Sequence, residues 1–244
     1  MIKRIFVTIL VIGLTACHVG QLTTLYTDKT SYEQDGIRYD AQNLPITGVY
    51  HKYSKTMRLQ EESHYVDGKL DGTCLIYNNS GKVVLNAQYK KGKLHGKTIS
   101  YYDSGNQKEI SNYKFDKLTG SRLGYYENGD LMNKGSYKKG KKHGLFEEYY
   151  HNGAIKTSIT YRKGKPHGAT RFFTKDNHLT NYTEYVNGKR EGPANTYYKN
   201  EKPKTLATRK NDKLDGAVKE FNTKGELTSV TTYVQGNQIN SVKF

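Results

Sequence analysis

The stretch YKKGKLHGKTISYYDSGNQKEISNY, residues 89–113, returns as YKKGKKHGLFEEYYHNGAIKTSITY at residues 137–161. Both copies begin and end on tyrosine, and both contain a Gly-Lys pair with a second glycine four residues after the first. The two copies begin 48 residues apart. This self-similarity indicates a short structural unit that is used many times.

The second glycine marks the register of the whole chain, because it recurs every 24 residues without a slip. These marker glycines are Gly72, Gly96, Gly120, Gly144, Gly168, Gly192 and Gly216. A lysine column lies three residues before them: Lys69, Lys93, Lys117, Lys141, Lys165, Lys189 and Lys213. An aromatic column lies five residues after them: Tyr77, Tyr101, Tyr125, Tyr149, Phe173, Tyr197 and Phe221. A tyrosine column lies seven residues before them, at Tyr65, Tyr89, Tyr113, Tyr137, Tyr161 and Tyr185, with Arg209 as the exception.

Each unit contains two turn signals. One precedes the lysine, with Gly or Asp directly before it, and the other lies nine residues after the marker glycine, where most units carry a glycine. Glycine, Asn and Asp tolerate the positive φ that hairpin turns need. The runs between the turns are rich in Tyr, Thr, Val and Ile, and AIKTSITY at 154–161 alternates apolar and polar residues with a period of two, as strands do.

A 24-residue hairpin cannot bury its apolar side alone, so each unit must stack on its neighbour. The sequence therefore predicts an all-β, elongated antiparallel β-meander of about fourteen strands, roughly 65–70 Å long. The repeat domain is predicted at 37–244, with a degenerate first unit, seven full units from 65 to 232 and a C-terminal cap in which Asn240 replaces the marker glycine.

The pattern YxxGKxxG followed by xxxxY(Y)xxG resembles the MORN repeat, in the variant form found in bacterial antitoxin-like proteins. The resemblance covers about residues 37 to 240, and it implies an elongated binding scaffold without one defined ligand. The pattern departs at Asp116, Glu201, Arg209 and Asp212. These departures leave the regularity of those turns open.

The N-terminus has the features of an exported lipoprotein. Residues 1–16 carry Lys3 and Arg4 and then a ten-residue apolar run, Ile5 to Leu14, too short to span a bilayer and typical of a signal peptide. Leu14-Thr15-Ala16-Cys17 resembles a bacterial lipobox, which predicts lipidation of Cys17; the alternative is an ordinary signal peptide that contains a cysteine. His18 after the cysteine resembles outer-membrane sorting, and residues 17–36 are predicted to be a flexible linker.

One cysteine, Cys74, is then left in the repeat domain. Because free cysteine is among the most buried residue types, we expect it to be buried and inert. The chain contains 22 tyrosines and no tryptophan, so the tyrosine columns are expected to line a narrow core with their polar tips at its border.

Four doubled tyrosines, Tyr102, Tyr126, Tyr150 and Tyr198, follow a member of the aromatic column directly. Since adjacent strand residues point to opposite faces, we expect these four to point outward and to offer a contact surface for a partner.

The formal net charge is +16, and the lysine column predicts a cation about every 9–10 Å along one edge. Such a stripe suits an extended anion: lipid headgroups, an acidic glycan or an acidic protein face. The alternative is that lysine after glycine serves only turn chemistry and solvation. Nucleic acid is not expected as a partner of a chain anchored outside the cytoplasm.

No motif of a catalytic, cofactor-binding or metal site is present. His143 and His167 would lie about 10 Å apart in adjacent units, too far to share one zinc ion. The sequence favours a non-catalytic, protein-binding lipoprotein of the bacterial envelope, and the resemblance implies antitoxin- or immunity-like neutralisation of a toxin or effector. The alternative is an envelope module that binds anionic phospholipid headgroups or acidic polysaccharide through the lysine column.

Overall fold

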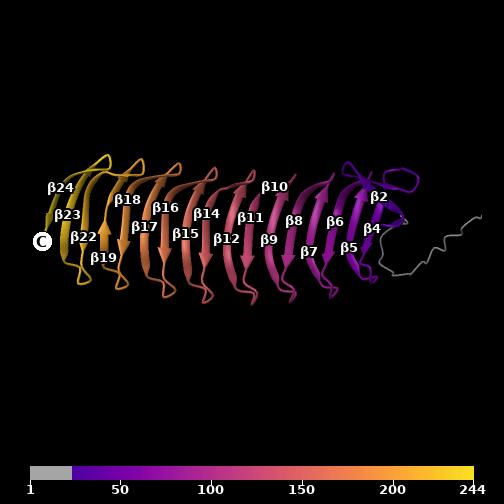
Figure 1. The fold of residues 1–244 in the computed structure, drawn as a ribbon, viewed down its shortest axis with the longest axis horizontal. Coiled ribbons are helices and arrows are strands. Elements are labelled where there is room, and N and C mark those ends of the chain that lie inside the picture. Colours follow the sequence, from indigo (N-terminus) through magenta and orange to yellow (C-terminus); the bar gives the residue numbers. More distant parts are fainter. Residues whose placement is uncertain (1–23) are drawn as a thin grey trace, which may run out of the picture.

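The computed structural model describes residues 24–244, and within that range every regular element is a strand (Figure 1). No helix in this part of the chain is long and apolar enough to cross a membrane. The predicted signal peptide, residues 1–16, and the lipidation site Cys17 lie outside the described residues.

The strands follow one another along an elongated ribbon (Figure 1). Their bounds are β1 (Leu25–Thr27), β2 (Ser31–Gln34), β3 (Ile37–Asp40), β4 (Gly48–Tyr53), β5 (Leu59–Val66), β6 (Lys69–Tyr77), β7 (Val83–Lys90), β8 (Lys93–Tyr101), β9 (Gln107–Lys114), β10 (Lys117–Leu118), β11 (Gly120–Tyr125), β12 (Leu131–Lys138), β13 (Lys141–Lys142), β14 (Gly144–Tyr149), β15 (Ile155–Arg162), β16 (Lys165–Phe173), β17 (Leu179–Val186), β18 (Lys189–Tyr197), β19 (Pro203–Leu206), β20 (Thr208–Lys210), β21 (Lys213–Leu214), β22 (Gly216–Phe221), β23 (Leu227–Val234) and β24 (Asn237–Lys243).

From β4 to β24 successive hairpin arms pair antiparallel, which confirms the predicted all-β meander. The main sheet has 22 strands, more than the fourteen or so expected. Four strands, β1, β4, β5 and β24, lie outside the fourteen of the seven full units, and four of those fourteen are each interrupted into two. At Thr119, His143 and Asp215 the strand breaks while the backbone N–H still donates to a carbonyl of the neighbouring hairpin arm.

The turn before each lysine is a two-residue loop in which both residues have positive φ, as type I′ hairpin turns require. Lys91 and Gly92, for example, have φ values of 52° and 76°. Asp116 and Asp212, where the glycine is missing, keep the same geometry with φ of 64° and 71°. The departures at these two positions therefore leave the turns regular.

The turn at the opposite edge is a three-residue loop closed by a residue with positive φ. In the turn after β8, the N–H of Gly105 donates to the Tyr102 carbonyl at 2.9 Å, and Gly105 has a φ of 98°. Glu201 occupies the same place with a φ of 64°. A non-glycine residue there is strained but still builds the turn.

Neighbouring two-residue turns are joined by one backbone hydrogen bond per unit. The N–H of Gly92 donates to the Leu70 carbonyl at 2.7 Å, and that of Gly140 donates to the Leu118 carbonyl at 2.8 Å. The same bond recurs at every such turn from Gly68 to Gly236, always to the residue 22 positions earlier. A unit of another length would break this ladder, which explains why the spacing never slips.

Each marker glycine lies at a β-bulge. Ala87 pairs with Thr98 and Tyr89 with Leu94, so Gln88 alone faces the three residues 95–97. Gly96 there has a φ of 109°, and a Cβ on it would lie 3.1 Å from the Cβ of Gln88. Bulges bend a strand, and the curved strands of Figure 1 follow from this repeated bend.

Large side chains are buried only at the N-terminal end, where Ile46, Tyr50 and Tyr65 pack together; along the rest of the described ribbon the core is thin and is formed by small side chains. Ser63, Ala87, Ser111 and Ala207 occupy one column at multiples of 24 residues, and each is buried. Cys74 pairs with Ser63 and Ala87 and is also buried, as expected, and burial raises the pKa of its thiol. The tyrosine column borders this core rather than filling it, because all its members except Tyr65 stay partly exposed.

The N-terminal segment forms a cap. The linker predicted at residues 17–36 therefore extends too far along the chain, because strands already begin within it. Instead of a linker up to residue 36, β1 pairs parallel with β4 and β2 forms a hairpin with β3. Arg38 of this cap lies 3.9 Å from the Tyr50 ring centre and pairs with Glu33, and its backbone N–H donates to the Gly68 carbonyl. The segment lacks the repeat pattern, so the sequence offered no sign of its pairing.

Replacing Gly96 with alanine should destabilise the protein by about 1–3 kcal/mol, since the bulge imposes a φ that L-residues rarely adopt. Thermal unfolding followed by circular dichroism measures this as a lower midpoint. Gly153→Asn is the matched control. Gly153 has a φ of 79° and leaves room for a side chain, and Asn177 occupies the equivalent turn position. Equal midpoints for Gly96→Ala and the control would contradict the bulge argument.

Candidate binding surfaces

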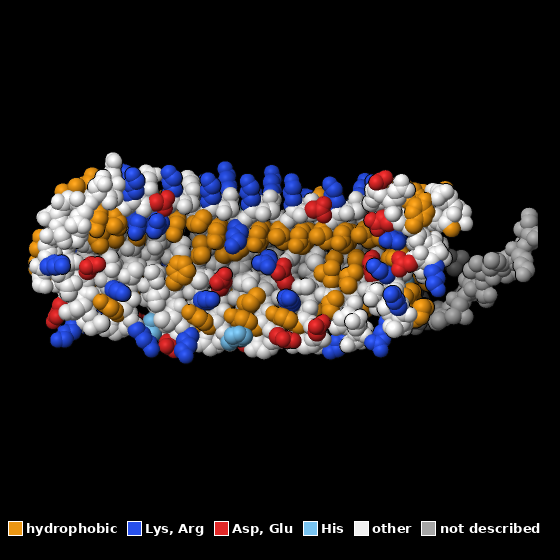
Figure 2. All heavy atoms as spheres, viewed as in Figure 1, with side chains coloured by type: hydrophobic (Ala, Val, Ile, Leu, Met, Phe, Trp, Pro, Cys, Tyr) orange, Lys and Arg blue, Asp and Glu red, His pale blue; other side chains and the backbone are white. Residues whose placement is uncertain are grey.

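The lysine column lies along the edge of the sheet that carries the two-residue turns. All seven lysines are exposed, and Figure 2 shows basic side chains in a row along the upper edge of the ribbon. None of the seven forms an ion pair within residues 24–244. Their stems support the next turn: a Cβ on Gly164 would lie 3.6 Å from the Lys141 Cβ. The column therefore has a packing role and still presents free charges.

Positive charge is concentrated at four consecutive turns in the middle of the ribbon. We call residues 90–93, 114–117, 138–141 and 162–165 the basic turns. Together they contain eleven Lys or Arg residues and one acidic residue, Asp116. The flanking turns at 66–69 and 186–189 carry one lysine each. The lysine column is thus even in spacing, but the charge along the edge is not.

The doubled tyrosines do not stand outward from a strand, so that expectation is wrong in its geometry. Each lies just past the end of a strand, at the start of a three-residue turn, and is partly buried. Each hydroxyl donates to a carbonyl of the next unit: Tyr102 to Tyr125 at 2.8 Å, Tyr126 to Tyr149 at 2.7 Å, Tyr150 to Phe173 at 2.9 Å and Tyr198 to Phe221 at 2.8 Å. They join successive units at this edge, as the backbone ladder does at the other, and a contact role for their rings stays a prediction.

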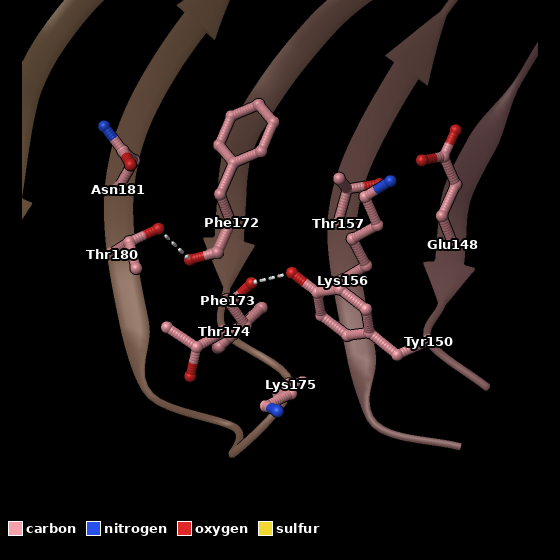
Figure 3. Close-up of a pocket in the computed structure, with 10 residues that line it drawn as sticks. All are labelled: Glu148, Tyr150, Lys156, Thr157, Phe172, Phe173, Thr174, Lys175, Thr180 and Asn181. Carbon is pink, nitrogen blue, oxygen red and sulfur yellow. Dashed lines mark hydrogen bonds between the residues drawn. The ribbon is translucent and has the colours of Figure 1, made fainter. Parts of the chain in front are cut away.

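An open groove of about 800 Å³ lies across strands β14 to β17 (Figure 3). A cross-strand row, in which Glu148 pairs with Thr157, Thr157 with Phe172 and Phe172 with Asn181, runs across it. Tyr150, Phe173, Thr174, Lys175, Lys156 and Thr180 complete the lining. Figure 3 shows the Phe172 ring projecting from its strand, with the Tyr150 ring one hairpin away.

Phe172 is the residue of this groove that sequence reasoning missed. Its side chain is 40% exposed, and its backbone carbonyl accepts a hydrogen bond from the Thr180 hydroxyl at 3.1 Å. The equivalent positions hold Lys52, Ile76, Ser100, Gly124, Glu148, Thr196 and Glu220. Being the only aromatic residue in its column is the signal that could have identified it.

Some of the charged side chains on the sheet faces form ion pairs. Arg122 donates to Glu109, and this hydrogen bond holds the pKa of the Glu109 carboxyl below its usual value. Lys134 donates to Glu147 at 2.8 Å, which raises the pKa of Lys134. Within residues 24–244 no group of three or more His, Cys, Asp and Glu side chains is placed to hold a metal ion.

A comparison with known families matches three consecutive units in the middle of the chain. They match the MORN repeat variant. The matched residues are 94–115, 118–139 and 142–163. MORN repeats commonly bind proteins or membrane lipids and are generally not enzymes. No curated protein matches the chain.

Tyr126→Phe should destabilise the protein by about 0.5–1.5 kcal/mol, because it removes the hydroxyl that bonds to the next unit and leaves the Tyr149 carbonyl without that donor. Urea unfolding is the measurement. Tyr101→Phe is the control, since the Tyr101 hydroxyl has no hydrogen-bond partner within the described residues. If Tyr126→Phe unfolds at the same urea concentration as the wild type, the doubled tyrosines do not join the units.

Proposed function

We propose that this chain is a non-catalytic protein-binding repeat whose contact centre is the groove at Phe172. The observation that supports this most is the exposed aromatic ring in an open, mostly apolar depression on a rigid sheet. Large aromatic side chains surrounded by polar ones are typical of the residues that dominate protein interfaces. Lys156, Glu148 and Asn181 supply the polar rim of such a contact.

The scaffold suits this role because its surface is held in place before binding. Every unit is fixed to its neighbours by backbone pairing and by the turn ladder, so little conformational freedom is lost when a partner docks. We further propose that the chain is exported and anchored through Cys17, on the outer membrane. In that setting the partner is a toxin or secreted effector that the chain neutralises. The support for this is the lipobox-like sequence at 14–17 and the resemblance to antitoxin-like repeats.

A pull-down with the chain lacking residues 1–16 tests the groove. Phe172→Ser should weaken capture of the partner by at least about tenfold, as expected for a central aromatic contact. Leu145→Ser is the matched control. Leu145, in β14, is another exposed apolar residue, but its side chain points to the sheet face opposite the one on which Glu148 and the groove lie. Equal loss in both variants, or in neither, would contradict the proposal.

The second candidate function is binding of anionic phospholipid headgroups or acidic polysaccharide by the lysine column. Its support is that all seven lysines are exposed and unpaired within residues 24–244. Such binding should weaken steeply with salt.

Sedimentation with anionic vesicles, and with an acidic polysaccharide, tests this second candidate. The quadruple variant Lys93→Gln, Lys117→Gln, Lys141→Gln and Lys165→Gln should abolish binding, because it removes the row of cations. Lys55, Lys82, Lys175 and Lys224, exposed lysines elsewhere on the surface, changed to glutamine together give a control with the same net charge. Unchanged affinity in the first variant counts against the lysine column, and equal weakening in both shows a response to net charge alone.

A further inference from the structure

The turn at residues 115–116 differs from the other two-residue turns, in which the first residue is polar or charged. Its first residue is Phe115, with a φ of 47°. The equivalent residues are Asp67, Lys91, Lys139, Lys163, Asn187, Asn211 and Gln235. A bulky aromatic residue in the left-handed region is strained. Strained residues of this kind cluster at functional sites.

The ring of Phe115 gains little burial in return for this strain. Phe115 is 44% exposed, and its ring lies against that of His95, with the ring centres 4.6 Å apart and the ring planes tilted by 60°. Nδ1 of His95 lies buried with no hydrogen-bond partner in the described residues. In four other units the side chain at this place accepts a hydrogen bond from the next turn, as Asp71 does from the Lys91 N–H at 3.1 Å. The turn at Phe115 therefore combines an aromatic residue with positive φ and a buried His95 nitrogen without a partner in the described residues.

Phe115 also lies in a depression of about 510 Å³ among the basic turns. The depression is lined by Lys93, Lys114, Phe115, Lys117, Thr119 and Lys139. None of its four lysines forms an ion pair within residues 24–244. An exposed aromatic ring thus shares one hollow with four lysines that form no ion pair and with one hydroxyl. No other basic turn has an aromatic residue at its tip.

We propose that this hollow is a binding site for an aromatic anion, a ring that carries a phosphate or carboxylate group. The ligand ring would stack on Phe115, whose exposed face offers a planar apolar surface. The acid group would be held by the surrounding ammonium groups, which act as point charges on phosphate and carboxylate. The site lies at the turn edge, away from the groove at Phe172, so it does not depend on the protein-binding proposal.

Phe115→Lys separates stacking from simple charge attraction. Lysine occupies the same turn position at residues 91, 139 and 163 with φ of 52–53°, so this variant should fold and should melt no lower than the wild type. Titrations use phenyl phosphate and benzoate as probes, with inorganic phosphate and acetate as the ring-free references, and follow the amide NMR shifts of residues 115–119. The wild type should bind each aromatic anion about threefold to tenfold more tightly than its reference.

Phe115→Lys should remove this preference and weaken the binding of phenyl phosphate, although it adds a positive charge. Attraction by charge alone predicts the opposite, tighter binding of all four anions. Lys117→Gln together with Lys139→Gln should weaken the binding of all four probes, and Lys55→Gln with Lys224→Gln, two exposed lysines outside both proposed sites, is the control of equal charge. The tighter of the two aromatic probes identifies the preferred acid group. Equal affinity of aromatic and ring-free anions in the wild type, or shifts spread evenly over all turns, would overturn the proposal.

Discussion

The structure depends on a left-handed backbone at fixed places in every unit. Two residues of the turn before the lysine, one residue of the opposite turn and the marker glycine all have positive φ. These positions reverse the chain and bend the strands, and the N–H of the second turn residue then reaches the preceding unit. Because that bond joins residues 22 positions apart at every turn, the length of each unit is set by its neighbour.

A scaffold held through its backbone leaves most side chains free to vary. The most buried column needs only small residues, such as Ser63, Ala87 and Ser111, and it contributes less apolar burial than a layer of large side chains would. Cohesion comes instead from strand pairing, the turn ladder and the tyrosine hydroxyls that join successive units. Repeat proteins of this kind are stabilised mainly by contacts between nearest neighbours.

The sequence was sufficient to predict the fold class and the positions of the turns, because each relies on residues that tolerate positive φ. The direction of Tyr102 was not predictable from strand alternation, since the strand ends at Tyr101 and Tyr102 already belongs to the turn. The pairing of β1 with β4 is parallel and involves three residues, too short a run to show a period. The groove at Phe172 combines residues of four strands, and it becomes visible only when the register of those strands is known.

Departures from the repeat keep the ladder intact while changing what the edge presents. Asp116 and Asp212 replace glycine, yet their N–H groups still donate to Leu94 and Arg190. In return, each aspartate carboxylate accepts a hydrogen bond from a backbone N–H, that of Leu94 at 2.8 Å for Asp116 and that of Arg190 at 3.0 Å for Asp212. Glycine cannot supply this bond. The residue before Asp212 is Asn211, which tolerates positive φ, whereas the residue before Asp116 is Phe115, which is strained there. The added hydrogen bond of Asp116 offsets part of that strain. It thereby allows an aromatic ring to lie among the lysines.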